Sequence, residues 1–278
     1  MEKILVQYRK TLEKIRENMR NIKYKIIIMS GKGGVGKSMV TANLAIAFSF
    51  KKYSVAILDA DLHGPSIPKM FGIVGENMYG GEKGILPVRK WNIDIVSLDF
   101  LIPDEDTPII WRGPLKTRAI TQFLSEVYWG KKDILLVDLP PGTGDEALSI
   151  AQNIPNISGS IIVTIPSQVS EHVVKKAITF NRKLNIPILG IIENMSYFIC
   201  PKCGEKYYLF GKNGGKELSK KMNVRLLGSI PIDPKISLSG DEGIPFLIKD
   251  KDSQISREFL RIAEKVLEIL TLSNTDGN

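Results

Sequence analysis

Short apolar runs alternate with longer segments of helical character along most of the chain. Such runs are expected for strands that are buried on both faces of a sheet. They lie at 26–29, 54–59, 93–96, 133–138, 160–164, 188–192 and 226–230. The segments between and after them predict helices at 39–47, 115–127, 170–184 and 254–270. This alternation predicts an α/β fold with a mostly parallel sheet and helices on both faces.

The two ends of the chain have patterns of their own. Residues 2–22 carry apolar side chains at alternating three- and four-residue steps, which predicts an amphipathic helix docked on the domain surface. A short dimer-forming coil is the alternative, because the seam is narrow and heptad-like. We therefore divide the chain into a helix at 1–23, a main domain at 24–272 and a disordered tail at 273–278. A hairpin-like insertion is expected at 84–98.

The composition is that of an ordinary soluble globular protein. The chain has 278 residues, of which 43% are hydrophobic and 24% are charged. No apolar stretch approaches the ~20 residues needed to span a bilayer, and the first residues lack a signal-peptide core. We therefore expect a cytoplasmic protein without a membrane partner. The formal net charge is +8, but lysines are interleaved with acids, so nucleic acid is not expected as a partner.

A glycine-rich segment with the sequence GKGGVGKS lies between the first predicted strand and the helix that follows it. Its members are Gly31, Lys32, Gly33, Gly34, Val35, Gly36, Lys37 and Ser38. Glycines allow several backbone N–H groups to face one anion, and the helix N-terminus adds its positive dipole end. In such a loop the lysine at position 37 reaches the β- and γ-phosphates, and the hydroxyl at position 38 reaches Mg²⁺. The alternative is a glycine-rich turn with a solvated lysine.

Three aspartates follow predicted strands at the edge of the sheet where α/β proteins bind ligands. They are Asp59, Asp61 and Asp138. Strand ends also carry aspartate simply as a turn or cap residue, so each acid alone is weak evidence. Their order around a phosphate-binding loop favours a nucleotide site. His63 lies in the same region, and we expect it to be a loop residue without a catalytic role.

The only two cysteines, Cys200 and Cys203, lie in the sequence CPKCG. This is a metal-knuckle turn, in which both thiolates point the same way. One knuckle supplies two ligands, whereas zinc and iron–sulfur clusters generally take four, and a symmetric homodimer would supply them. The spacing does not distinguish zinc from an iron–sulfur cluster. A redox dithiol and a merely structural pair are two further interpretations of the same spacing.

The motifs in their order resemble those of a known family. The sequence KGGVGKS at 32–38 is similar to the signature of the deviant Walker A ATPases. With DADLHGPS at 59–66, WRGP at 111–114, DLPPGTGD at 138–145, ENMS at 193–196 and CPKCG at 200–204, the chain resembles the Mrp/ApbC-type iron–sulfur cluster carrier ATPases. The resemblance covers residue 24 to the C-terminus. The chain lacks the extra N-terminal domain or cysteine cluster that some members carry, so no second cluster is expected.

The resemblance implies a function and a set of roles. It implies a labile [4Fe-4S] cluster held between two subunits at Cys200 and Cys203, delivery to apo iron–sulfur proteins, and slow hydrolysis of ATP. The implied catalytic residues are Lys32, acting across the dimer interface, Lys37 and Asp61. The implied Mg²⁺ ligands are Ser38, Asp59 and Asp138, and Asn194 is the implied adenine contact. The alternative is a zinc-stapled dimeric ATPase of the MinD/ParA type that acts as a scaffold.

Overall fold

The fold is built on one eight-stranded sheet. The computed structural model describes residues 2–61, 64, 66–101 and 113–275. The sheet contains β1 (Ile22–Ser30), β2 (Val55–Asp59), β5 (Val88–Lys90), β6 (Ile93–Ser97), β7 (Lys132–Asp138), β8 (Gly159–Thr164), β9 (Ile188–Glu193) and β12 (Leu226–Ser229). The strand order is β12-β9-β8-β1-β7-β2-β6-β5, and only the β5–β6 pair is antiparallel. The predicted fold class is confirmed.

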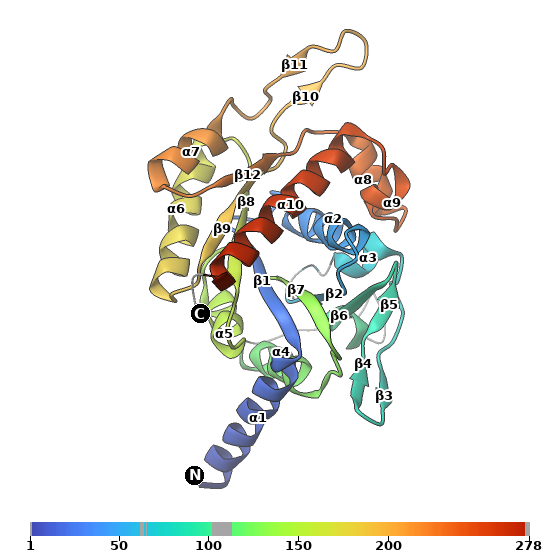
Figure 1. The fold of residues 1–278 in the computed structure, drawn as a ribbon, viewed down its shortest axis with the longest axis vertical. Coiled ribbons are helices and arrows are strands. Elements are labelled where there is room, and N and C mark those ends of the chain that lie inside the picture. Colours follow the sequence, from blue (N-terminus) through green and yellow to red (C-terminus); the bar gives the residue numbers. More distant parts are fainter. Residues whose placement is uncertain (1, 62–63, 65, 102–112, 276–278) are drawn as a thin grey trace.

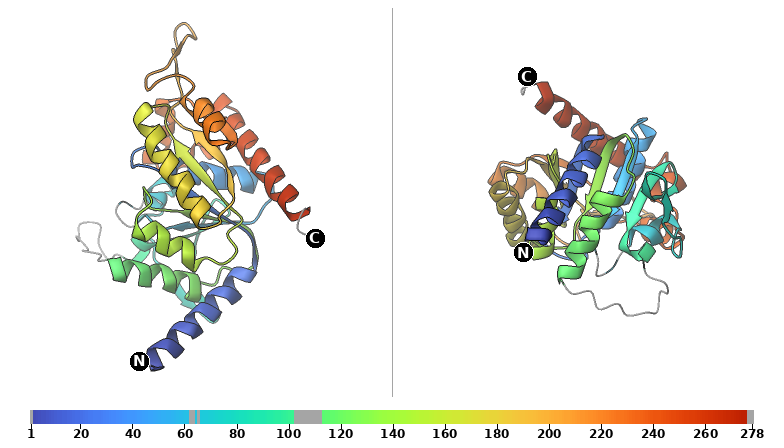
Figure 2. Two further views of the ribbon diagram at one scale, coloured as in Figure 1. Left: turned by 90° about the vertical axis from the view of Figure 1, so that its left-hand side faces the viewer. Right: turned by 90° about the horizontal axis from the view of Figure 1, so that it is seen from below.

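Helices cover both faces of the sheet (Figures 1 and 2). One face packs against α2 (Lys37–Phe50), α3 (Ile67–Phe71), α8 (Pro234–Asp241), α9 (Phe246–Lys249) and α10 (Gln254–Thr275). The other packs against α1 (Glu2–Arg20), α4 (Gly113–Glu126), α5 (Asp145–Asn153), α6 (Gln168–Lys183) and α7 (Gly214–Met222). Strand β1 serves both layers, since Ile26 and Ile28 face the first core and Ile27 and Met29 face the second.

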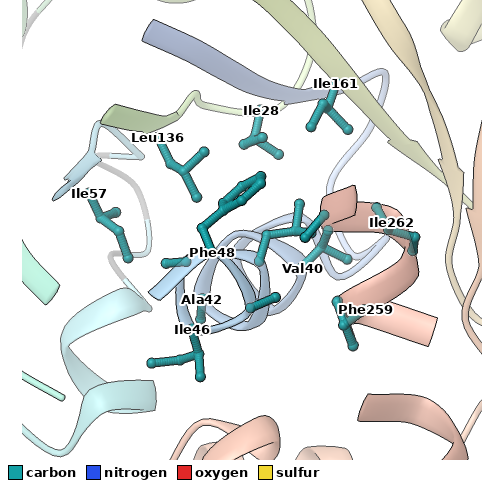
Figure 3. Packing of buried hydrophobic residues seen from close by; sticks show 14 of the residues in the cluster. Ile28, Val40, Ala42, Ile46, Phe48, Ile57, Leu136, Ile161, Phe259 and Ile262 are labelled. Carbon is teal, nitrogen blue, oxygen red and sulfur yellow. The ribbon is translucent and has the colours of Figure 1, made fainter. Parts of the chain in front are cut away.

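Helix α2 carries the phosphate-binding loop and is buried on nearly all sides. Figure 3 shows Phe48 between the helix and the sheet, with Ile28 and Leu136 beside it, while Phe259 and Ile262 of α10 approach from another side. A helix that is apolar all round belongs in a core. The loop at its N-terminus is thus held by a rigid support.

Helix α1 docks on α4 through its C-terminal half, as expected. Ile15 and Met19 are buried there. Asn18 Nδ2 donates hydrogen bonds to the carbonyl oxygens of Leu124, Ser125 and Val127, at 3.2, 2.9 and 3.3 Å. These carbonyls lie at the C-terminal end of α4, where helical partners are missing. The N-terminal half projects from the body at the end opposite the hairpin of β10 (Phe198–Ile199) and β11 (Lys206–Tyr207) (Figure 1).

Several element boundaries differ from those expected. Strand β1 begins at Ile22, which the periodicity assigned to the first helix. The last helix continues to Thr275, beyond its expected end at Leu270 and into the segment predicted as a disordered tail. No Gly or Pro interrupts residues 271–275, so nothing stops the helix where its apolar stripe ends.

The hairpin-like insertion expected at 84–98 is present as β4 (Gly84–Leu86) and the antiparallel β5–β6 pair. The other short elements were not predicted individually: α3, α5, α7, α8, α9, the 3₁₀ turn at Leu98–Leu101, β3 (Tyr79–Gly81), which pairs with β4, and the hairpin of β10 (Phe198–Ile199) with β11 (Lys206–Tyr207). Segments of this length hold too few apolar positions for a period to be recognised.

Candidate nucleotide site and cysteine hairpin

The glycine-rich loop has the conformation that its sequence predicts. Gly34 and Gly36 adopt positive φ angles of 75° and 78°, and Gly36 directly precedes α2. A Cβ on Gly36 would lie 2.3 Å from Asn194 Nδ2, so a side chain has no room there. The loop therefore exposes backbone N–H groups at the N-terminus of a buried helix, which is an anion-binding arrangement.

Asn194 supports the loop from the neighbouring strand. It follows β9, is nearly completely buried, and donates from Nδ2 to the carbonyl oxygen of Val35 at 2.8 Å. Its backbone N–H donates to Thr164 O at 2.7 Å. The predicted adenine contact stays a prediction, and the structure adds that this amide links the loop to the sheet.

Lys37 is directed at the carboxylates of the adjacent strand ends. Its Nζ lies 2.6 Å from Asp138 Oδ2 and 3.8 Å from Asp61 Oδ2. Ser38 Oγ donates to the same Asp138 oxygen at 2.5 Å. The predicted lysine, hydroxyl and two of the three acids are thus gathered at one edge of the sheet.

Thr41 completes the support of Asp138 and was not predicted. Its Oγ1 donates to Asp138 Oδ1 at 2.6 Å, and the residue is fully buried. It lies one helical turn after Lys37, on the same face of α2. The only sequence indication was a hydroxyl in a mostly apolar stretch, which is also common where threonine approaches its own helix backbone, as Thr41 Oγ1 approaches Lys37 O at 3.1 Å.

Asp59 lies beside Asp138, since their strands pair in register at this position. Burial, and after it the charge of Asp138, raise the pKa of Asp59 to about 8, although Lys37 acts in the opposite direction. The Asp59 carboxylate accepts hydrogen bonds from Ser97 Oγ and from the Asp61 backbone N–H, both at 3.2 Å. The cluster thus holds more negative charge than one lysine neutralises. Together with the Ser38 hydroxyl these hard oxygen ligands fit Mg²⁺.

A cavity of about 630 Å³ opens next to the loop. Gly36 and Asn194 border it on the loop side, and Pro231, Ile232 and Asp233 border it beyond β12. The segment that directly follows β12 therefore forms one wall of the cavity. This volume is typical of a small-ligand site.

The cysteines lie in the turn of the β10–β11 hairpin, which projects from the carboxyl edge of the sheet (Figure 1). Cys200 N–H donates to Glu205 O at 2.9 Å, and Gly204 N–H donates to Cys200 O at 2.8 Å. Backbone N–H groups of Cys203 and Lys202, and the Cys203 thiol, lower the pKa of Cys200. Both thiols are free and at least partly exposed. The two cysteines share one tight turn whose N–H groups favour thiolate, the metal-binding form, and metal binding there stays a prediction.

Some predicted positions lie outside the described residues. They are His63 in the segment after β2, and Trp111 and Arg112 of the WRGP motif. Lys32 is half-buried in the loop, where its carbonyl oxygen accepts a hydrogen bond from Ser30 Oγ at 2.9 Å. Among the described residues, no helix is long and apolar enough to cross a membrane.

The parallel sheet, the glycine-rich loop before a buried helix and the acids on adjacent strand ends define a P-loop nucleoside triphosphatase. The model of the ParA family described as NUBPL iron-transfer P-loop NTPase matches residues 21–267. The chain belongs to this family.

Individual relatives agree with this assignment. An iron-sulfur cluster carrier protein of Saccharolobus solfataricus is 54% identical over 258 residues, which are 92% of this chain and 87% of that protein. A nucleotide-binding protein from Archaeoglobus fulgidus, solved in complex with ADP, has a TM-score of 0.78 at 39% identity, covering 90% of this chain and 96% of that one. The septum site-determining protein MinD of Pyrococcus horikoshii, complexed with Mg-ADP, has a TM-score of 0.66 at 24% identity, covering 90% and 98%, and shows likeness of fold alone.

Proposed function

We propose that two copies of this chain hold one labile [4Fe-4S] cluster between their cysteine hairpins and deliver it to apo iron–sulfur proteins, with slow hydrolysis of ATP. The observation that carries the proposal is the pair of free, accessible thiols on a projecting hairpin of an iron-transfer P-loop NTPase. The relative from Saccharolobus solfataricus, named as a cluster carrier, supports it. The cluster is cargo, so an exposed site suits its transfer.

The homodimer follows from the number of ligands. The whole chain contains 2 cysteines, whereas a [4Fe-4S] cluster takes four thiolates. A two-fold axis that passes between two hairpins brings the four thiols together. The same assembly would let Lys32 of each subunit reach the nucleotide of its partner. A cation supplied in trans accelerates phosphoryl transfer by roughly 10³–10⁵ in GTPases.

The nucleotide site has a role for each of its residues. The loop N–H groups and Lys37 bind the phosphates, and Ser38, Asp59 and Asp138 would hold Mg²⁺. When bound, Mg²⁺ supplies neutralisation of charge on the β- and γ-phosphate oxygens. Asp61 orients a water and accepts its proton. The water oxygen bonds to the γ-phosphorus, the bond to the β–γ bridging oxygen breaks, and ADP leaves with that electron pair.

We place the reaction in the cytoplasm, where thiols stay reduced and accessible to iron. Binding of ATP would tighten the dimer through Lys32 and through the glycine-containing segments after β2 and β7. Such a change would alter the solvent access of the shared cysteines, and with it the ease with which the cluster leaves.

Anaerobic reconstitution with iron and sulfide tests the proposal. The full chain should become brown, with broad visible absorption, and should pass its iron to an apo acceptor within one incubation. Cys203→Ala should lose the colour while it retains nucleotide binding, because the hairpin turn lies apart from the phosphate loop. A colourless dimer that holds one zinc would overturn the carrier function and favour the zinc-stapled scaffold.

A further inference from the structure

The arm that leaves the cysteine hairpin forms part of the wall of the nucleotide cavity. Leu209 and Phe210 follow β11 closely and line the cavity, together with Gly36 and Asn194 on the loop side. They are nevertheless 61% and 44% exposed. Exposed apolar side chains at the wall of a cavity are available to contact a bound small molecule. The cavity next to them leads directly to the phosphate-binding loop.

The arm that enters the hairpin is also attached to a residue of the cavity wall. The Ile232 backbone N–H donates to Tyr197 O at 2.7 Å, and Ile232 forms an isolated parallel bridge with Phe198, the first residue of β10. Ile232 itself lines the cavity. One arm of the hairpin that carries Cys200 and Cys203 therefore lines the cavity itself, and the other arm is hydrogen-bonded to a residue that lines it.

Beyond Phe210 the chain packs closely against the body. Gly211 has a φ of 120°, and a Cβ there would lie 2.4 Å from Pro166 O. On the hairpin side, the rings of Tyr197 and Tyr208 lie 6.3 Å apart and join the two arms. A shift of Leu209 and Phe210 would therefore pass toward β11 and the cysteine turn, because the chain on the other side packs closely against Pro166.

We propose that Leu209 and Phe210 form a wall for the nucleotide's purine, and that through them nucleotide binding changes the accessibility of Cys200 and Cys203. The purine is the occupant because the cavity is continuous with Gly36, at the point where the loop would hold the phosphates. Apolar side chains can pack against the flat face of a purine ring, whereas phosphates need hydrogen-bond donors such as backbone N–H groups. The inference rests on the proposed nucleotide site and names how that site regulates the hairpin.

The first test compares nucleotide affinities. The double variant Leu209→Ala with Phe210→Ala should bind ADP about tenfold more weakly, the usual order for loss of base stacking. Its affinity for inorganic tripolyphosphate, which has no base, should not change. Matched controls are Phe50→Ala and Leu238→Ala, since these side chains are 42% and 56% exposed and lie outside the cavity wall. An ADP affinity within twofold of wild type would overturn the proposal.

The second test measures coupling in reduced, metal-free protein. Iodoacetamide should alkylate the cysteines of the wild type at a rate that saturating ADP changes by about fivefold, a common size for coupling between sites. The double variant, also saturated with ADP, should keep the nucleotide-free rate, and both controls should respond like wild type. A wild-type rate that ADP leaves unchanged overturns the proposal. Because no metal is present, the outcome is independent of whether the hairpins hold a cluster or zinc.

Discussion

At the scale of single residues, the nucleotide site contains buried carboxylates whose desolvation and mutual repulsion are unfavourable. Asp59 and Asp138 are buried on adjacent strands, with Asp61 close by and Lys37 between them. Taking carboxylates out of water is costly unless a cation compensates them. The arrangement makes sense for a protein that binds a divalent cation with its nucleotide, and it costs stability when both are absent.

Asp59→Asn should stabilise the nucleotide-free protein at neutral pH. The pKa of Asp59 is raised from 3.8 to about 8, so between these values the folded state binds more protons than the unfolded state, and stability falls as pH rises. The variant has no ionisable group at this position, so it does not lose stability in this way as pH rises. In chelator, its Tm should exceed that of wild type by about 2–4 °C or more at pH 8, and by less at pH 5.

Asp133→Asn provides a control of opposite sign. Hydrogen bonds from the Ser54 hydroxyl and backbone N–H lower the pKa of Asp133. The ionised carboxylate therefore stabilises the folded state above its usual pKa, and this stabilisation is lost in acid. This variant should therefore be less stable at pH 8. A lower Tm at pH 8 for Asp59→Asn as well would contradict the account of the buried carboxylates.

At the scale of elements, α1 belongs to the body of the protein through its C-terminal half. Asn18 supplies hydrogen bonds to three carbonyls at the end of α4, and the ammonium of Lys25 donates to Met19 O in the last turn of α1 and to Ile22 O at the start of β1. The bonds to α4 and to Met19 O satisfy backbone groups that a helix end leaves open. This docked half leaves only the exposed N-terminal part available for a coiled coil.

Asn18→Ala should lower the free energy of unfolding by about 1–3 kcal/mol, because partly buried carbonyls lose their donor. Urea denaturation measures the change. Thr11→Ala, on the exposed part of the same helix, should stay within about 0.5 kcal/mol of wild type. Equal effects of the two substitutions would show that α1 is not held by this contact.

The sequence was most informative for features that one continuous segment of the chain defines. Apolar runs such as 133–138 place the strands, and the glycine spacing places the phosphate loop. It was least informative where the contact joins distant segments. The bond from Asn194 to Val35, the bond from Thr41 to Asp138, and the position of Phe210 at the cavity depend on packing that no local pattern encodes.

At the scale of the whole molecule, the hairpin and α1 lie at opposite ends of the long axis (Figures 1 and 2). The hairpin and the phosphate loop both emerge from the carboxyl edge of the sheet, since β1 and β9 run parallel. A dimer that joins the hairpins therefore forms from the nucleotide-binding end. This geometry suits an assembly in which nucleotide and cluster share one interface.

Mixing of variants tests whether Lys32 acts across that interface. Lys32→Ala and Asp61→Asn should each be inactive alone, but an equal mixture should recover about a quarter of the wild-type ATPase rate, since half of the dimers gain one complete site. Lys37→Ala mixed with Asp61→Asn should recover nothing, because both residues serve their own subunit. If the mixture of Lys32→Ala and Asp61→Asn has only the average of the ATPase rates of the two separate variants, Lys32 does not act in trans.

Native mass spectrometry of the anaerobically reconstituted full chain, with nucleotide present, tests the central claim most directly. We predict two chains that carry together one set of four irons and four sulfides. Single chains, or dimers with a metal bound separately to each chain, would contradict it.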